Sequence, residues 1–156
     1  MRSESARMSS AAEARFRVQA PNSRPRTVTV VALDPPGEAA VRRLADGDWK
    51  QTSFFTASTS TLQDLAGTPQ RLDAAVGGAD LVVLIAGPGG RADAAAIVGA
   101  ACSDRRVMTT GFVVGGGAAP ERELSKTLAQ LRPWSLMLVV ASADEYLDDM
   151  MTALRA

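Results

Sequence analysis

Short runs of consecutive apolar residues recur along the chain and alternate with segments in which apolar residues are spaced three or four positions apart. Continuous apolar runs are typical of strands buried on both faces of a sheet, and the wider spacing is typical of helices that pack against it. A weaker run at residues 52–57 predicts a short strand near a sheet edge. The strong runs predict strands at residues 28–33, 81–86, 107–114 and 136–141.

Helices are expected between the strands, and several begin with a recognisable signal. Aspartate is favoured at the residue that caps a helix, and proline is tolerated in the first turn, where its missing N–H costs nothing. Asp34 and Asp93 are therefore placed to cap the helices that follow them, and Ser142 starts a capping box with Glu145. Further helices are expected to open at Thr68-Pro69, which Gly77-Gly78 would end, and at Pro120.

Strands and helices alternate throughout the chain. This pattern predicts an α/β fold with three layers: a Rossmann-like, doubly wound, mostly parallel sheet of about five strands. With the first strand at the centre, the ligand crevice of such a fold lies at the carboxyl ends of the strands. Residues 1–26 lack periodicity and contain Pro21 and Pro25, so we expect a disordered arm. Residues 27–156 are expected to form a single domain.

Charge and composition exclude several classes of function. The 17 basic and 17 acidic side chains cancel, so no net field attracts the chain to nucleic acid or to an anionic membrane. The sequence has no histidine and one cysteine, Cys102, and it predicts neither a metal site nor a catalytic residue. Cys102 lies among alanines, as expected of an inert buried thiol. No apolar run is long enough to span a bilayer, and the lone cysteine fits a reducing compartment, so a cytoplasmic location is expected.

The loop after the first strand reads Asp34-Pro35-Pro36-Gly37, at the place where nucleotide-binding folds have a glycine-rich loop. A phosphate held at a helix N-terminus requires free backbone N–H groups, and the two prolines have none. The Asp34 carboxylate also repels phosphate, because two like charges about 4 Å apart cost about 1–4 kcal/mol, depending on the local dielectric. We therefore interpret this loop as a structural helix cap.

Two glycine-rich loops, at residues 87–91 and 115–117, follow later strands. Glycines leave the backbone exposed, and Arg91 adds a permanent charge that can contact an anion in bidentate fashion. The alternative is structural: the glycines let the chain turn sharply, and Arg91 lies in solvent. The candidate ligand-binding residues are Gly87, Gly89, Gly90, Arg91, Gly115 and Gly116.

Across residues 26–150, the order of these segments resembles the nucleotide-binding domain of the FtsZ/tubulin family. "VTVVALDPPGEAAVRRL" (residues 28–44) is similar to the family's first strand, glycine loop and helix. "LDAAVGGADLVVLIAGPGGRADAAAIVGAA" (residues 72–101) is similar to its helix, strand and "AGMGGGTGTGAAP" loop, and "VMTTGFVV" (residues 107–114) to the next strand. "ELSKTLAQLRPWSLMLVVASADEYL" (residues 123–147) resembles the helix, strand and acidic element that follow.

The chain departs from this family where the nucleotide binds. The first glycine loop has become Asp-Pro-Pro-Gly, and the family signature GGGTGTG is reduced to Gly89 and Gly90 followed by Arg91-Ala92-Asp93. The family's phosphate-binding residues can therefore be carried over only to Gly87, Gly89 and Gly90. The family's catalytic loop and second domain have no counterpart, so the resemblance implies a shortened, degenerate relative without GTP hydrolysis or tubulin-type polymerisation.

These departures predict a non-catalytic, FtsZ-like domain that acts as a binding, accessory or self-associating protein without GTPase activity and without a cofactor. Its partner is expected to be another protein or a second copy of itself. Met150, Met151 and Leu154 of the last helix are a candidate contact, unless they pack in the core. The alternative is a small-ligand or nucleotide-binding protein, or an enzyme subunit, whose site is built from residues 87–91 and 115–117.

Overall fold

Seven strands form one mixed sheet in a computed structural model of the chain, which describes residues 25–59, 61–142 and 145–156, apart from the side chain of residue 145. The strand order across the sheet is β4-β3-β2-β1-β5-β6-β7, so β1 lies at the centre. The strands are β1 (Val28–Ala32), β2 (Thr52–Ala57), β3 (Leu62–Asp64), β4 (Pro69–Gln70), β5 (Leu81–Ala86), β6 (Met108–Val113) and β7 (Met137–Val140).

Five of these strands are parallel. β1 pairs with β2 on one side and with β5 on the other, and β6 and β7 continue the sheet beyond β5 in the same direction. Counted along the chain, the five strands have the order 2-1-3-4-5, which is one of the common orders of doubly wound sheets. The other two strands differ from the sequence prediction of about five: β3 turns back to pair antiparallel with β2, and β4 pairs antiparallel with β3.

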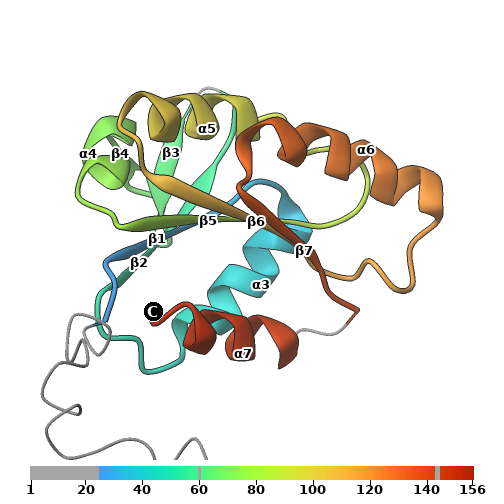
Figure 1. Cartoon of the computed structure of the whole chain (residues 1–156), viewed down its shortest axis with the longest axis horizontal. Helices are drawn as coiled ribbons and strands as arrows, with labels where there is room; N and C mark the ends of the chain where they lie inside the picture. The colour runs from blue at the N-terminus through green and yellow to red at the C-terminus, as the bar shows by residue number, and fades with distance from the viewer. Residues whose placement is uncertain (1–24, 60, 143–144) are drawn as a thin grey trace, which may run out of the picture.

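Helices cover both faces of the sheet and give three layers (Figure 1). On one face lie α3 (Pro35–Ala45) and α7 (Glu145–Ala153). On the other face lie α4 (Leu72–Gly77), α5 (Ala95–Asp104) and α6 (Glu121–Leu131), and a short 3-10 helix, η2 (Arg132–Trp134), joins α6 to β7. The prediction of an α/β fold with a mostly parallel sheet and helices packed on it is confirmed.

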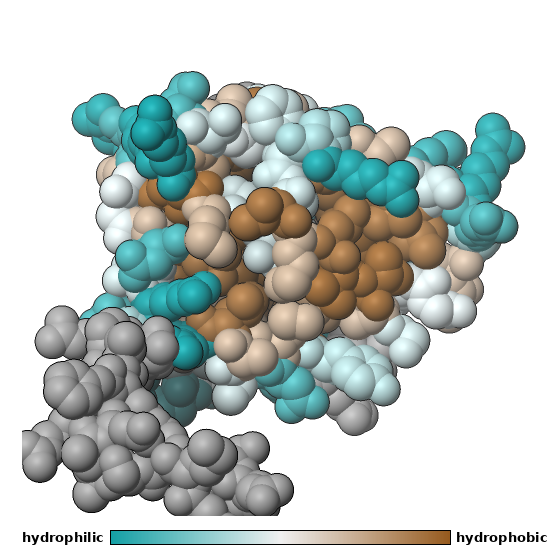
Figure 2. Space-filling model, in the orientation of Figure 1, coloured by the Kyte–Doolittle hydropathy of each residue, from teal (hydrophilic) through white to brown (hydrophobic). Residues whose placement is uncertain are grey.

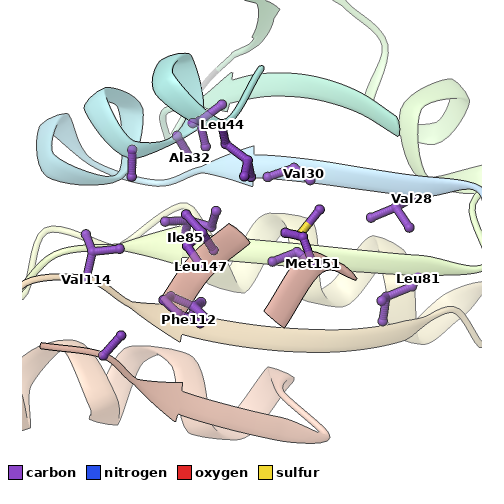
Figure 3. Packing of buried hydrophobic residues seen from close by; sticks show 14 residues of the cluster. Val28, Val30, Ala32, Leu44, Leu81, Ile85, Phe112, Val114, Leu147 and Met151 are labelled. Carbon is purple, nitrogen blue, oxygen red and sulfur yellow. The ribbon is translucent and has the colours of Figure 1, made fainter. Parts of the chain in front are cut away.

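Two apolar cores fill the spaces between the layers. Because successive residues of a strand point to opposite faces, Val30 packs toward α3 and α7, whereas Val31 packs toward α4 and α5. Figure 3 shows the first core, in which Leu147 and Met151 of α7 point toward the strands and Leu147 lies near Ile85 and Phe112. The central strands β1 and β5 are buried along their whole lengths, as their unbroken apolar runs predict.

The helix predicted to open at Thr68-Pro69 begins later. Pro69 and Gln70 form β4, the outermost strand on that side of the sheet, and α4 starts at Leu72. Proline suits the first turn of a helix and also an edge strand, because part of the edge backbone needs no partner, so the residue alone does not distinguish the two. Gly77 ends the helix and Gly78 caps it, as predicted.

The strand predicted to be buried at residues 136–141 is the opposite edge of the sheet. Among the described strands, β7 is paired only with β6, and Leu136, which precedes it, is 77% exposed. In the helix that follows, Met151 is fully buried, and Met150 and Leu154 pack partly against the same core. The stripe proposed as a candidate contact is therefore mainly core.

Two other predicted helix caps, at Asp93 and Ser142, are not confirmed. Ala94 is the residue before α5 and makes no side-chain cap, while the Asp93 carboxylate accepts a hydrogen bond from Nε2 of Gln130 at 2.9 Å. The capping box at Ser142 depends on residues outside those described. So does the predicted arm, apart from residues 25 and 26; the Arg26 amide donates to the Arg155 carbonyl at 2.8 Å.

Candidate functional site

The crevice expected of a doubly wound sheet lies where two neighbouring strands send their helices to opposite faces. Here these strands are β1, which leads into α3, and β5, which leads toward α5. Asp34 follows β1 and Gly87 follows β5, so the two loops meet at the carboxyl edge of the sheet. This is the position at which folds of this class hold a ligand.

The Asp34 carboxylate occupies the anion position at the N-terminus of α3. Its Oδ1 accepts the N–H of Gly37 at 2.8 Å, which confirms the predicted helix cap. The same carboxylate accepts the N–H of Gly87, at 3.0 Å through Oδ1 and at 2.9 Å through Oδ2. Asp34 is only 7% exposed. Because it accepts both amides, the protein's own carboxylate uses the N–H groups that a bound anion would otherwise contact.

Opposing effects act on the ionisation of Asp34. Burial is the largest, and it raises the pKa above the ordinary 3.8 because the charged form loses water. Hydrogen bonds from the amides of Gly37 and Gly87 lower the pKa, as does the nearby charge of Arg91, but they do not compensate for the burial. The backbone hydrogen bonds therefore stabilise the charged form of Asp34, while its burial disfavours that form more strongly.

Close packing accounts for the glycines of these two loops. A Cβ atom placed on Gly87 would lie 2.5 Å from Cβ of Pro36, and one placed on Gly37 would collide with the carbonyl oxygen of Ile85. Contacts this short do not occur between real side chains, so both positions require glycine as the loops are built. The glycines therefore let the loops approach each other and the sheet, independently of any ligand.

The second loop is bound to α6 through its backbone. The N–H of Gly90 donates to Oγ1 of Thr127 at 2.9 Å, and that hydroxyl donates to the Gly87 carbonyl at 2.9 Å. Oε1 of Gln130 accepts the Ala92 N–H at 2.9 Å, and its Nε2 donates to the Gly90 carbonyl. The Gly89 N–H donates to the carbonyl of residue 123 at 3.1 Å. These amides are therefore already used and are not free to cradle a phosphate.

A cavity of about 450 Å³ opens beside Asp34, between the carboxyl ends of β1 and β2 and the start of α5. This volume lies within the usual range of small-ligand sites. Among its described lining residues, the charged ones are Arg91, with one guanidinium, and Asp34, Glu38 and Asp93, with three carboxyl groups. The hydroxyl groups and the amide in its wall come from Thr56, Ser58, Thr59, Thr61 and Gln63.

The candidate residues from the sequence lie in different surroundings. Arg91 lines the cavity, whereas Gly87, Gly89 and Gly90 hold the loop against Asp34 and α6. The lining that the structure describes does not include the third glycine loop. The Gly116 amide donates to the Ala141 carbonyl at 3.1 Å, next to the end of β7, and Gly115 adopts a φ of 71°, which favours glycine.

The sequence pattern gave no indication of Thr127 and Gln130. They lie on α6, 37 to 40 residues from the loop atoms that they contact, and a single polar residue on a helix carries no signal of its partner. The polar wall of the cavity did carry a signal. The run "TASTSTLQD" (residues 56–64) starts at the carboxyl end of β2 and ends in β3, and polar residues at the carboxyl end of a parallel strand are well placed to line a crevice.

No protein-family model matches the chain, and no curated protein is significantly similar to it in sequence. The fold and the site therefore define only a general class: an α/β protein with a seven-stranded, mostly parallel sheet. Within the part of the chain that the structure describes, no helix is both long and apolar enough to cross a membrane. The same described residues contain no group of three or more histidine, cysteine or acidic side chains arranged to hold a metal ion.

Proposed function

We propose that this chain is a non-catalytic, Rossmann-like domain that acts by binding another protein or a second copy of itself, without GTP binding or turnover. The observation that carries the proposal is the buried Asp34 carboxylate at the N-terminus of α3. It already accepts the N–H groups of Gly37 and Gly87, and Pro35 and Pro36 offer none. A nucleotide phosphate would have to displace a group of the same charge.

The resemblance to the FtsZ/tubulin family supports the same proposal. According to this proposal, the chain is a degenerate relative in which the loops that bind phosphate in the family serve only to hold the structure together. Two features favour this interpretation: the close contact between Gly87 and Pro36, and the use of the Gly89 and Gly90 amides by α6. The cytoplasmic location and the protein partner expected from the sequence belong to this proposal.

Isothermal titration calorimetry with GTP and GDP in the presence of Mg²⁺ tests the proposal, together with an assay of phosphate release. We expect neither binding in the micromolar range nor release above the rate in buffer. Asp34→Asn is the informative variant, because it removes the negative charge and leaves Pro35 and Pro36 in place. If the variant binds nucleotide and the unaltered chain does not, the negative charge of Asp34 is what excludes the nucleotide. Sub-micromolar binding of GTP or GDP by the unaltered chain would overturn the proposal.

A second candidate function is the binding of a small ligand in the cavity beside Asp34. The observation that favours it is the presence of Arg91 in the wall of a cavity of suitable volume at the carboxyl edge of the sheet. Three carboxyl groups share that wall, so a ligand with a single anionic group and several hydroxyl or amine groups fits it better than a polyphosphate does.

A thermal-shift screen with hydroxy acids, amino acids and sugar acids, alongside nucleotides, flavins and coenzyme A derivatives, tests this second function. A ligand held by Arg91 raises the melting temperature of the unaltered chain and has no effect on Arg91→Ala. Arg122→Ala is the matched control, since Arg122 is exposed on α6, outside the lining of this cavity. If no compound in the screen raises the melting temperature, or if Arg91→Ala responds as strongly as the unaltered chain, this function loses its support.

A further inference from the structure

The two edges of the sheet are built in opposite ways. At one edge, β4 is two residues long and contains Pro69, and short edge strands with proline are a common protection against pairing with another chain. At the other edge, β7 and its flanks read "LMLVVA" (residues 136–141), without a charge or a proline. Among the described strands, β7 is paired only with β6, so the backbone groups on its outer side face the open edge.

Exposed apolar side chains gather around this open edge. Most of the large hydrophobic side chains that are exposed in the described residues lie on or directly before β7, at the start of β6, or at the start of α7. They are Met108, Leu136, Met137, Val140 and Tyr146. Figure 2 shows apolar surface over the side of the sheet where β7 lies, between α6 and α7. Contiguous exposed apolar side chains can mark contact sites.

Helix α7 extends the patch. Tyr146, Met150 and Ala153 are spaced by three or four residues, so they share one face of the helix, next to the face whose Leu147 and Met151 fill the core. That outer face and the end of β7 line a groove of about 470 Å³. Among its described lining residues, Asp149 is the one charged side chain.

We propose that the β7 edge is the contact between two copies of this chain, joined by antiparallel pairing of the two β7 strands. A two-fold axis perpendicular to the sheet, between the two β7 strands, brings the same uncharged edge from each copy together, and it places the outer faces of the two α7 helices on the same side of the joined sheet. The occupant is a second copy because the edge of β7 offers alternating backbone donors and acceptors to an identical antiparallel edge, and residues 136–141 carry no like charges that would face each other. The chain also has no net charge that would hold two copies apart.

This inference rests on the proposed function in one respect: both hold that the chain acts by binding a protein. Its test does not involve nucleotide. A chain that is monomeric and binds no GTP would overturn the dimer and leave the non-catalytic role standing, whereas a dimer that binds GTP would do the reverse.

Sedimentation equilibrium and light scattering over about 1–100 μM protein test the dimer, a range that covers the affinity of a modest interface. We expect a mass of twice 16.3 kDa at the upper concentrations. Val140→Lys should give the monomer mass, because a lysine on an edge strand opposes pairing. Ile97→Lys is the matched control: Ile97 is 43% exposed and Val140 is 44% exposed, and Ile97 lies on α5, away from the edge. It should remain dimeric.

Hydrogen exchange provides a second measurement, in case Val140→Lys lowers stability. Amides of β7 that face the open edge should exchange slowly in the dimer and quickly on dilution, while β1 stays protected at all concentrations. The proposal is overturned if the unaltered chain is monomeric throughout the range. It is also overturned if Val140→Lys stays dimeric, or if the β7 amides show no dependence on concentration.

Discussion

The Asp34 carboxylate accepts the backbone N–H of Gly87, 53 residues away, at 2.9 Å through Oδ2 and at 3.0 Å through Oδ1. Because its Oδ1 also caps α3 through Gly37, one side chain joins the loops that follow the two central strands, β1 and β5. In a nucleotide-binding fold, a phosphate makes contacts of this kind. The same hydrogen bonds therefore give Asp34 its structural role and support the proposal that this crevice holds no phosphate.

Replacing Asp34 by alanine should destabilise the fold. Asp34→Ala leaves the N–H groups of Gly37 and Gly87 without their acceptor in a buried place, so we expect a loss of about 1–3 kcal/mol in the free energy of unfolding, measured with urea. Asp80→Ala is the control, since Asp80 also accepts a backbone N–H, from Thr27, but at an exposed site. Equal losses in the two variants would show that burial at the crevice gives Asp34 no special role.

The ionisation of Asp34 makes a second prediction. Its pKa in the folded protein is raised above 3.8, so the folded protein holds this proton more tightly than the unfolded chain does. The stability that this group contributes is complete below pH 3.8 and is lost as the pH rises through the raised pKa.

Asp34→Asn cannot ionise and should lack this pH dependence. The free energy of unfolding of the variant, minus that of the unaltered chain, should therefore increase as the pH is raised from below 3.8 to neutrality, so that the variant becomes relatively more stable. Urea titrations of both proteins at several pH values measure the difference. A constant difference, or one that changes in the opposite direction, would contradict the raised pKa.

The sequence predicted the layers of the fold correctly but did not predict which strands lie at the edges of the sheet. Unbroken apolar runs identify strands with neighbours on both sides, and β1 and β5 have the predicted position and burial. The run at residues 136–141 has the same composition, yet it forms an edge, because strand order depends on how the crossovers pack and not on the strand's own residues. Pro69 illustrates the other difficulty, since proline is compatible with both a helix start and an edge strand.

For the site, the capping role of Asp34 can be predicted from the sequence, but its second partner cannot. The cap is local, because the side chain contacts Gly37 three residues on, and local chemistry is visible in sequence. The bond to Gly87 joins segments far apart and follows only from the pairing of β1 with β5. For the same reason, the contacts of Thr127 with Gly87 and Gly90 could not be predicted.

The close approach of the two crevice loops predicts that Gly87 cannot accept a methyl group. In Gly87→Ala the new Cβ atom would lie 2.5 Å from Cβ and 2.8 Å from Cγ of Pro36, whose ring is fixed in the first turn of α3. We expect a loss of about 1–3 kcal/mol in the free energy of unfolding. Gly78→Ala is the control, because a Cβ atom there meets nothing within 4 Å, and its stability should change little. A variant at Gly87 as stable as the control would mean that the loops are not in contact.

The last prediction concerns the chemistry of Cys102. This thiol is 1% exposed at the base of α5, and burial raises its pKa above 9.0, opposed by a hydrogen bond with Thr109 and by the charge of Arg105. Because the thiolate is the reactive form, Cys102 should not react with Ellman's reagent at neutral pH in the folded protein and should react fully in denaturant. Ser125→Cys adds an exposed thiol on α6 and should give one rapid equivalent without denaturant. Rapid reaction of the unaltered folded chain would show instead that α5 opens readily from the sheet, which the tight packing of Gly99 against Trp134 does not favour.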